Sequence, residues 1–120
     1  MATIMTVDDC ASMRQLVAFT LQSVGHDVVE AVDGSEAVSI ARDKKIDLMI
    51  VDVNMPNMDG LSFVKSVRGM PSHKFTPILM LTTEAEEHKR QQGRAAGATG
   101  WIVKPFSPEQ LLSVVKKVLN

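Results

Sequence analysis

Five short apolar runs alternate with longer amphipathic segments along this chain, and this alternation restricts the folds that are open to it. The runs occupy residues 3–7, 27–31, 48–51, 78–81 and 101–103. Three of them are almost wholly apolar, which is typical of parallel strands that are covered on both faces. The run at 27–31 is the most polar, and we therefore expect it at an edge of the sheet.

The segments between the runs carry helix patterns. Apolar residues recur at helical spacing from Met13 to Val24, over 35–44, and from Leu61 to Val67. Asp59 is a predicted N-cap, and Ser107, Pro108 and Gln110 together form a strong helix-start signal before the last segment. The fourth segment, 84–98, is mostly charged or amide and offers only alanines for burial, so it is expected to pack weakly.

This order predicts an α/β fold, with a parallel sheet and helices on both faces. Ligands bind such sheets at the carboxyl ends of the strands. The residues there share polar chemistry and are Asp8, Asp9, Asp52, Asn54, Thr82 and Lys104. Their coincidence at successive strand ends predicts a functional site.

Composition excludes several other classes of protein. The 120 residues fit one domain, and 13 Lys and Arg against 14 Asp and Glu give a net charge of -1. This balance provides no electrostatic basis for binding nucleic acid or membrane. The only cysteine is Cys10, which suits a reducing compartment, and no signal peptide or apolar span of roughly 20 residues is found. We expect a single cytoplasmic domain over residues 1–120.

Three carboxylates at one edge would repel one another without a positive partner. A hard divalent cation such as Mg²⁺ fits oxygen ligands, and the absence of His and Cys from this set argues against zinc. In such a site Asp52 can attack an electrophilic phosphorus, Lys104 can pair with a phosphoryl oxygen, and the Thr82 hydroxyl can donate to another. These are parts that phosphoryl transfer requires.

The stretches "VDDCASMR", "MIVDVNMPNMDG", "PILMLTTE" and "GATGWIVKPF" resemble the receiver domain of two-component response regulators. The likeness covers essentially the whole chain and is greatest for the stand-alone chemotaxis regulators. It implies a flavodoxin-like fold of five parallel strands in the order 2-1-3-4-5 with five helices, without an output domain. It also implies a monomeric signalling switch, rather than an enzyme that acts on other substrates.

The resemblance implies roles for individual residues. Asp52 would accept a phosphoryl group from a histidine kinase, and Lys104 would hold that group. Mg²⁺ would be bound directly by Asp9, Asp52 and the backbone carbonyl of Asn54, and by Asp8 mostly through a water molecule. The Lys104–Pro105 peptide bond would be cis.

Further positions would serve switching and signal lifetime. Thr82 would move toward the phosphoryl group while Trp101 rotates inward, where the family often has tyrosine or phenylalanine. Asn54 and Glu84 would tune hydrolysis of the acyl phosphate. The surface of the fourth helix, fifth strand and fifth helix would contact targets, such as a flagellar motor switch protein or a phosphatase.

Three alternatives stay open at this stage. A receiver could drain phosphate from a kinase without binding the motor. A haloacid-dehalogenase-type phosphatase also forms an aspartyl phosphate, but it has a second Asp two residues after the nucleophile, where this chain has Asn54. A flavodoxin would need a phosphate loop after the first strand, where Asp8 and Asp9 would repel the phosphate.

Overall fold

The computed structural model describes residues 2–55, 58–83 and 87–119. Strands and helices alternate along them, with a short 3₁₀ turn before the fourth strand. The elements are β1 (Thr3–Val7), α1 (Ala11–Gln22), β2 (Asp27–Ala31), α2 (Gly34–Asp43), β3 (Leu48–Asp52), α3 (Gly60–Arg68), η1 (Pro71–His73), β4 (Ile78–Thr82), α4 (Glu87–Ala96), β5 (Gly100–Val103) and α5 (Pro108–Leu119).

All strand pairs are parallel, in the order β2-β1-β3-β4-β5. The predicted fold class and strand order are therefore confirmed, and the polar strand β2 lies at an edge as expected. Every residue of β3 and β4 is buried, in agreement with their apolar sequences. Both strands extend one residue further than the sequence indicated, so that Asp52 and Thr82 are the last residues of strands rather than the first residues of loops.

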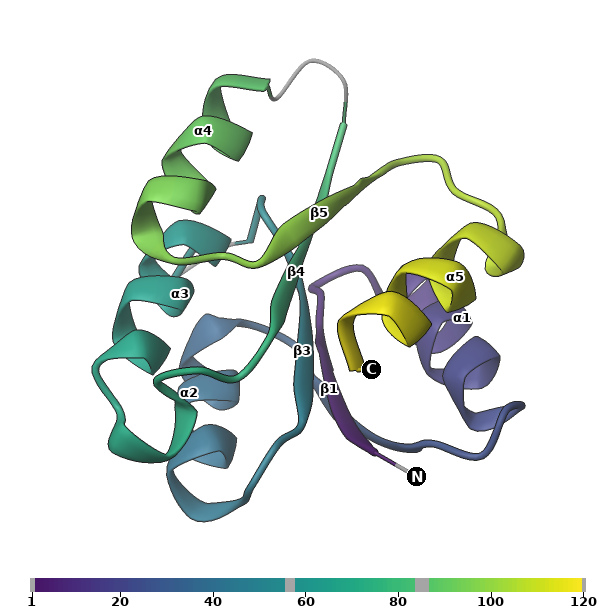
Figure 1. Ribbon diagram of the computed structural model, residues 1–120, viewed down its shortest axis with the longest axis horizontal. Helices are drawn as coiled ribbons and strands as arrows, with labels where there is room; N and C mark the ends of the chain where they lie inside the picture. Colours follow the sequence, from purple (N-terminus) through teal and green to yellow (C-terminus); the bar gives the residue numbers. More distant parts are fainter. Residues whose placement is uncertain (1, 56–57, 84–86, 120) are drawn as a thin grey trace.

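Helices cover both faces of the sheet, with α2, α3 and α4 on one face and α1 and α5 on the other (Figure 1). Successive residues of a strand point to opposite faces, which divides the core in two. Met49 and Val51 of β3 pack with Phe63 of α3, whereas Leu48 and Ile50 belong to the cluster under α1 and α5.

The predicted helix-start signals are confirmed. The Ser107 amide donates to the Gln110 side-chain oxygen at 2.8 Å, and the Gln110 amide donates to the Ser107 hydroxyl at 3.1 Å. This reciprocal pair is a capping box. Asp59 accepts a hydrogen bond from the Ser62 amide at 2.8 Å, as an N-cap residue should.

The predicted apolar stripe of the first helix was too wide. Helix α1 ends at Gln22, and Val24 lies beyond it with 50% of its surface exposed. Leu16 is also 44% exposed, so the buried face consists mainly of Val17 and Leu21. His73, in the short turn η1, is fully buried, and its Nε2 lies 2.9 Å from the Ala41 carbonyl of α2.

Helix α4 contacts the sheet through its backbone. A Cβ at Gly93 would lie 2.9 Å from the sulfur of Met80 and 3.6 Å from Leu61. A helix that is short of apolar side chains can therefore still lie close to the sheet, and Ala96 of α4 also packs against the core. None of the helices in the described residues is long and apolar enough to cross a membrane.

Candidate functional site

Three carboxylates meet at the carboxyl edge of the sheet. Asp8 and Asp9 follow β1, and Asp52 ends the neighbouring strand β3. One ligand oxygen from each lies within 4.8 Å of the other two. Asp8 and Asp52 are 1% and 5% exposed, whereas Asp9 is open to solvent. The predicted convergence of these three residues is thus observed.

Asp8 is held at three points. Its amide donates to the Ala31 carbonyl at 3.1 Å, its carbonyl accepts from Arg14 Nη1 at 2.8 Å, and its Oδ1 accepts from the Cys10 amide at 2.9 Å. The other carboxylate oxygen, Oδ2, is buried and has no hydrogen-bond partner among the described residues. Burial raises the pKa of the Asp8 carboxyl; the Cys10 amide opposes this shift, and repulsion from Asp52 adds to it.

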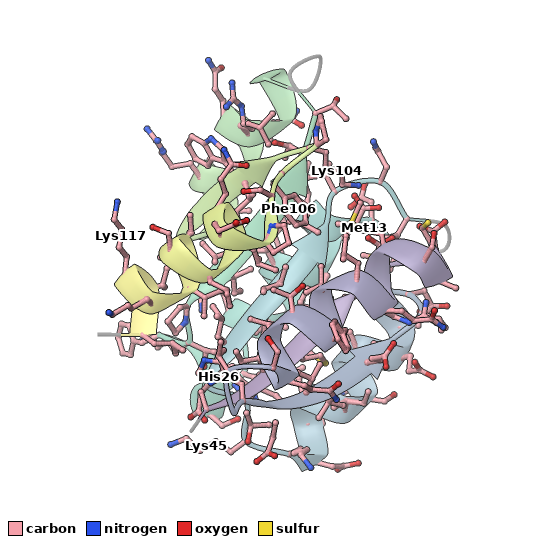
Figure 2. The ribbon with its side chains drawn as sticks, turned by 90° about the vertical axis from the view of Figure 1, so that its right-hand side faces the viewer. Met13, His26, Lys45, Lys104, Phe106 and Lys117 are labelled. Carbon is pink, nitrogen blue, oxygen red and sulfur yellow. The ribbon has the colours of Figure 1, made fainter. Side chains whose placement is uncertain are left out.

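Lys104 compensates the charge of Asp52. Its Nζ lies 2.9 Å from Asp52 Oδ1, and the two side chains are 24% and 8% exposed. Lys104 comes directly after β5, and its amide donates to the Thr82 carbonyl at 2.6 Å. The Lys104–Pro105 peptide bond is cis, as expected. Lys104 lies toward the same end of the molecule as Met13, whereas His26 and Lys45 lie toward the other end (Figure 2).

Thr82 ends β4, the strand next to β3, and is 1% exposed. Its hydroxyl has no hydrogen-bond partner within the part of the chain that the structure describes. A buried hydroxyl without a partner is costly, so its presence beside the carboxylates suits a ligand that accepts a hydrogen bond.

The carboxylate site fits a Mg²⁺ ion. Its donors are oxygens only, and the buried Oδ2 of Asp8 lacks the partner that an ion or its bound water would provide. Asn54 is exposed and lies two residues beyond β3, close enough along the chain to contribute a ligand. Glu84, the other predicted hydrolysis-tuning residue, lies outside the described residues.

The strand end that carries Asp52 is in direct contact with the start of α3. The Gly60 amide donates to the Val53 carbonyl at 3.1 Å. A Cβ at Gly60 would lie 2.6 Å from the Asp52 carbonyl oxygen and 2.9 Å from the Met80 methyl group. Real Cβ atoms do not approach this closely, so only glycine fits without movement.

Trp101 lies apart from the carboxylates, on the edge strand β5. It is half-buried, and the guanidinium carbons of Arg90 and Arg94 lie 5.5 and 4.7 Å from its ring centroid. These are cation–π distances. With Gln91, the three residues line a hollow of about 280 Å³ between α4 and β5.

Arg14 is a site residue that sequence reasoning missed. It lies within the stretch "VDDCASMR", but nothing in the helical pattern indicates that its side chain turns back to the Asp8 carbonyl. The Cys10 amide was missed too, since the sequence argument used Cys10 only as an indicator of the redox compartment.

Comparison with known proteins relates the chain to one family. The family described as "Response regulator receiver domain" matches residues 4–116 of this chain. A chemotaxis protein CheY homologue of Campylobacter jejuni is 38% identical over 119 residues, which cover 98% of this chain and 92% of the homologue. Other curated relatives are transcriptional regulatory proteins such as ResD of Bacillus subtilis, 39% identical, and the chain spans about half their length.

Solved structures agree with this relationship. The chemotaxis protein CheY4 of Vibrio cholerae has 54% identity and a TM-score of 0.95, with 99% of each chain covered. The receiver domain of the Pseudomonas aeruginosa sensor histidine kinase PA1611 has 26% identity and a TM-score of 0.91, covering 98% of this chain and 97% of that domain. That structure holds a magnesium ion coordinated in the active-site cleft.

Proposed function

This chain belongs to the response regulator receiver domain family, and we propose that it is a switch controlled by phosphorylation of Asp52. The observation that supports this most directly is a buried carboxylate paired with Lys104 at 2.9 Å, beside a second carboxylate with an unpartnered buried oxygen. Such a site holds a nucleophile, Asp52, among carboxylates that lack enough positive partners. A bound cation would neutralise the carboxylates, and Lys104 would pair with an oxygen of the incoming phosphoryl group.

The proposed reaction is transfer from a phosphohistidine of a histidine kinase. An Asp52 carboxylate oxygen attacks phosphorus and the phosphorus–nitrogen bond breaks. The phosphohistidine ring is protonated on its other nitrogen, so that the nitrogen that keeps the bonding pair leaves in a neutral imidazole. Lys104 then exchanges its contact with Asp52 for one with a phosphoryl oxygen, and the Thr82 hydroxyl donates to another. Both moves use groups that already lie at the site, so catalysis is mainly positioning and charge neutralisation.

The metal ligands are proposed from the same geometry. Asp9, Asp52 and the Asn54 carbonyl would hold Mg²⁺ directly, and Asp8 would act through a bound water. When bound, the ion would neutralise the carboxylates and the phosphoryl oxygens. The magnesium ion in the PA1611 receiver domain supports this choice of metal. Asn54 and Glu84 are proposed to tune hydrolysis of the acyl phosphate.

The finer proposal is a role in chemotaxis, in which the target is the flagellar motor switch. This chain would act as a single, monomeric receiver domain in the cytoplasm. The likeness to CheY4 and to the Campylobacter homologue over nearly their whole length supports it. The partner surface would include α4 and β5, where Trp101 lies beneath Arg90 and Arg94. Phosphorylation would shift an existing equilibrium at this surface.

Incubation with acetyl phosphate and Mg²⁺ tests the phosphorylation site. Intact-protein mass spectrometry should show one added phosphoryl group, which hydroxylamine removes. Asp52→Asn should abolish the addition, whereas Asp43→Asn, which removes an exposed carboxylate at the end of α2, should leave it unchanged. An unchanged yield in Asp52→Asn would place the acceptor elsewhere.

Two further measurements address switching and target. Because Trp101 is the only tryptophan, its fluorescence and quencher accessibility should change when beryllofluoride and Mg²⁺ are added. No response would reject Trp101 as the switch residue.

A pull-down of the phosphorylated protein with motor-switch and kinase peptides distinguishes the two signalling roles. Capture of the kinase peptide alone would favour a phosphate sink over a motor regulator.

A further inference from the structure

Arg14 connects Asp8, at the end of β1, to β2 at the edge of the sheet. Its Nη1 donates to the Asp8 carbonyl at 2.8 Å, and its Nε donates to Glu30 Oε1 at 3.0 Å. Arg14 lies on α1, Asp8 follows β1, and Glu30 lies on β2. One guanidinium therefore joins three consecutive elements at the point where two proposed ligands are held.

We propose that Arg14, oriented by Glu30, is a positioning residue for the Mg²⁺ site; this inference rests on the proposed function. Arg14 is not a ligand itself, because its guanidinium is a cation without an acceptor atom and donates to the Asp8 carbonyl and to Glu30 on β2. It acts on the ion through the peptide unit that links Asp8 to Asp9.

The contacts of Asp8 show how this works. The bond from its amide to Ala31 fixes the peptide plane before Asp8, and the bond from Arg14 fixes the plane after it. The Cys10 amide fixes the carboxylate through Oδ1, which leaves Oδ2 as the one buried oxygen for the site. Without Arg14, the Asp8–Asp9 peptide plane could rotate and both carboxylates would shift together.

A role in stability alone explains the contact less well. An exposed ion pair adds little to stability, and the Glu30 side chain is 42% exposed. The Arg14 side chain is only 14% exposed and donates to two acceptors at once. A lysine has no planar fork and cannot reproduce that geometry.

Charge and position predict opposite effects on metal binding. As a nearby positive charge, Arg14 would weaken the binding of a cation, so its removal would strengthen binding. As a positioning residue, it would strengthen binding, so its removal would weaken it. Outer-shell partners of this kind typically change metal affinity by about 10-fold or more, and we therefore expect position to dominate.

The experiment is a titration with Mn²⁺, a hard cation that accepts the same oxygen ligands and whose free form is measured by electron paramagnetic resonance. Arg14→Met should bind Mn²⁺ about 10-fold more weakly than the wild type. Arg14→Lys keeps the charge and one possible donor, and should recover part of the loss. Arg42→Met, which removes an exposed arginine from α2, should bind as the wild type does.

Glu30→Gln tests the pairing. On its own it should weaken Mn²⁺ binding less than Arg14→Met, because the amide oxygen can still accept from Nε. Combined with Arg14→Met it should add no further loss, since both act through one contact. Additive losses would show that Glu30 acts separately and would overturn the pairing.

Thermal unfolding in EDTA shows that each variant is folded before titration, and Arg14→Lys and Glu30→Gln carry the test if Arg14→Met does not fold. An affinity of Arg14→Met equal to or tighter than that of the wild type would overturn the positioning role alone. Absence of Mn²⁺ binding by the wild type would overturn the proposed metal site as well, so the two failures are distinguishable.

Discussion

Buried polar groups lie at both ends of the sheet, but they have hydrogen-bond partners at the amino end and lack some of them at the carboxyl end. At the amino ends of β4 and β5, Arg68 donates to the carbonyls of His73, Thr76 and Gly97 at 2.7–3.0 Å. The buried His73 ring contacts Thr76 Oγ1 and the Ala41 carbonyl through its two nitrogens. At the carboxyl ends, Asp8 Oδ2 and Thr82 Oγ1 lack partners among the residues described.

The difference distinguishes structural polar groups from functional ones. A chain that can supply four hydrogen bonds from one arginine at one end of its sheet has no general difficulty in satisfying buried polar atoms. The unsatisfied oxygens at the other end reduce stability, and such deficits are found where a ligand completes a site, although the buried Thr6 hydroxyl within β1 also lacks a partner among the described residues. Substitutions at the two ends should therefore have opposite effects on the stability of the metal-free protein.

The largest expected effect is at the amino end. Arg68→Met should lower the free energy of unfolding by about 2 kcal/mol, because the carbonyls of His73, Thr76 and Gly97 lose a charged donor. Urea unfolding followed by circular dichroism measures this. The exposed Arg42→Met is the matched control and should change stability by less than about 0.5 kcal/mol. Equal stability of the two variants would remove the contrast between the two ends.

The opposite sign is expected at the carboxyl end. Asp8→Asn should raise the free energy of unfolding by about 1 kcal/mol in EDTA, because it removes a buried charge that faces Asp52 and Asp9. The same urea experiment measures it. In saturating Mg²⁺ the gain should vanish or reverse, since the wild type gains stability by binding the ion and the variant gains less. A destabilised Asp8→Asn in EDTA would contradict this account.

The pH dependence sharpens the same point. The pKa of Asp8 is raised above 3.8 in the folded state, so the native protein holds this proton more strongly than the unfolded chain. Below pH 3.8 the carboxyl is protonated in both states, so the difference in unfolding free energy between the metal-free wild type and Asp8→Asn should not change with pH. As the pH rises from 3.8 through the raised pKa, the wild type should lose stability relative to the variant. Above the raised pKa the difference should stay constant. Unfolding of both proteins across this range in EDTA gives the difference directly. A difference that grew toward acid pH would have the wrong sign.

The smallest effect is expected at Thr82. Thr82→Val replaces an unpartnered buried hydroxyl by a methyl group of similar size, and should raise the unfolding free energy by about 0.5 kcal/mol. Differential scanning calorimetry can resolve this, with Thr20→Val as the matched control. Thr20 is also buried, but its hydroxyl donates to the Leu16 carbonyl at 2.8 Å, so the same change there should destabilise. Equal changes at both positions would refute the distinction.

The pattern was sufficient for the fold class because three of the five strands are nearly continuous apolar runs and because α3 and α5 begin with recognisable caps, whereas the strand order came from the resemblance to receiver domains. The convergence of Asp8, Asp9 and Asp52 followed from the rule that parallel strands end at one edge. Strand ends were less predictable: Asp52 and Thr82 continue the backbone ladder although their side chains are polar. A polar side chain indicates where a strand reaches the site, but it does not indicate where the backbone hydrogen bonds between strands end.

Other features depend on contacts between residues that are distant in the sequence. Nothing in the local pattern around His73 indicates burial, because its partner Ala41 lies on another helix. Gly93 lies in a helix with few apolar side chains, and nothing near it in the sequence indicates that Met80 of β4 lies against its backbone. Arg14 turns back to Asp8, only six residues away, but its other partner, Glu30, lies on β2, sixteen residues further along the chain. Periodicity reports which face of an element is buried, but it does not report which particular atoms meet there.

The close fit at Gly60 has a mechanical consequence. The Asp52 carbonyl, the Val53 carbonyl and the Met80 methyl group all lie against this one residue, and there is no space between them for even a single added carbon. The first turn of α3 therefore cannot move independently of the strand that carries Asp52. Any displacement of Asp52 along the strand axis would be passed to α3 by direct contact, as between two parts of one rigid body. Movement at the site that leaves α3 in place must then come from the side chains or from the other strands.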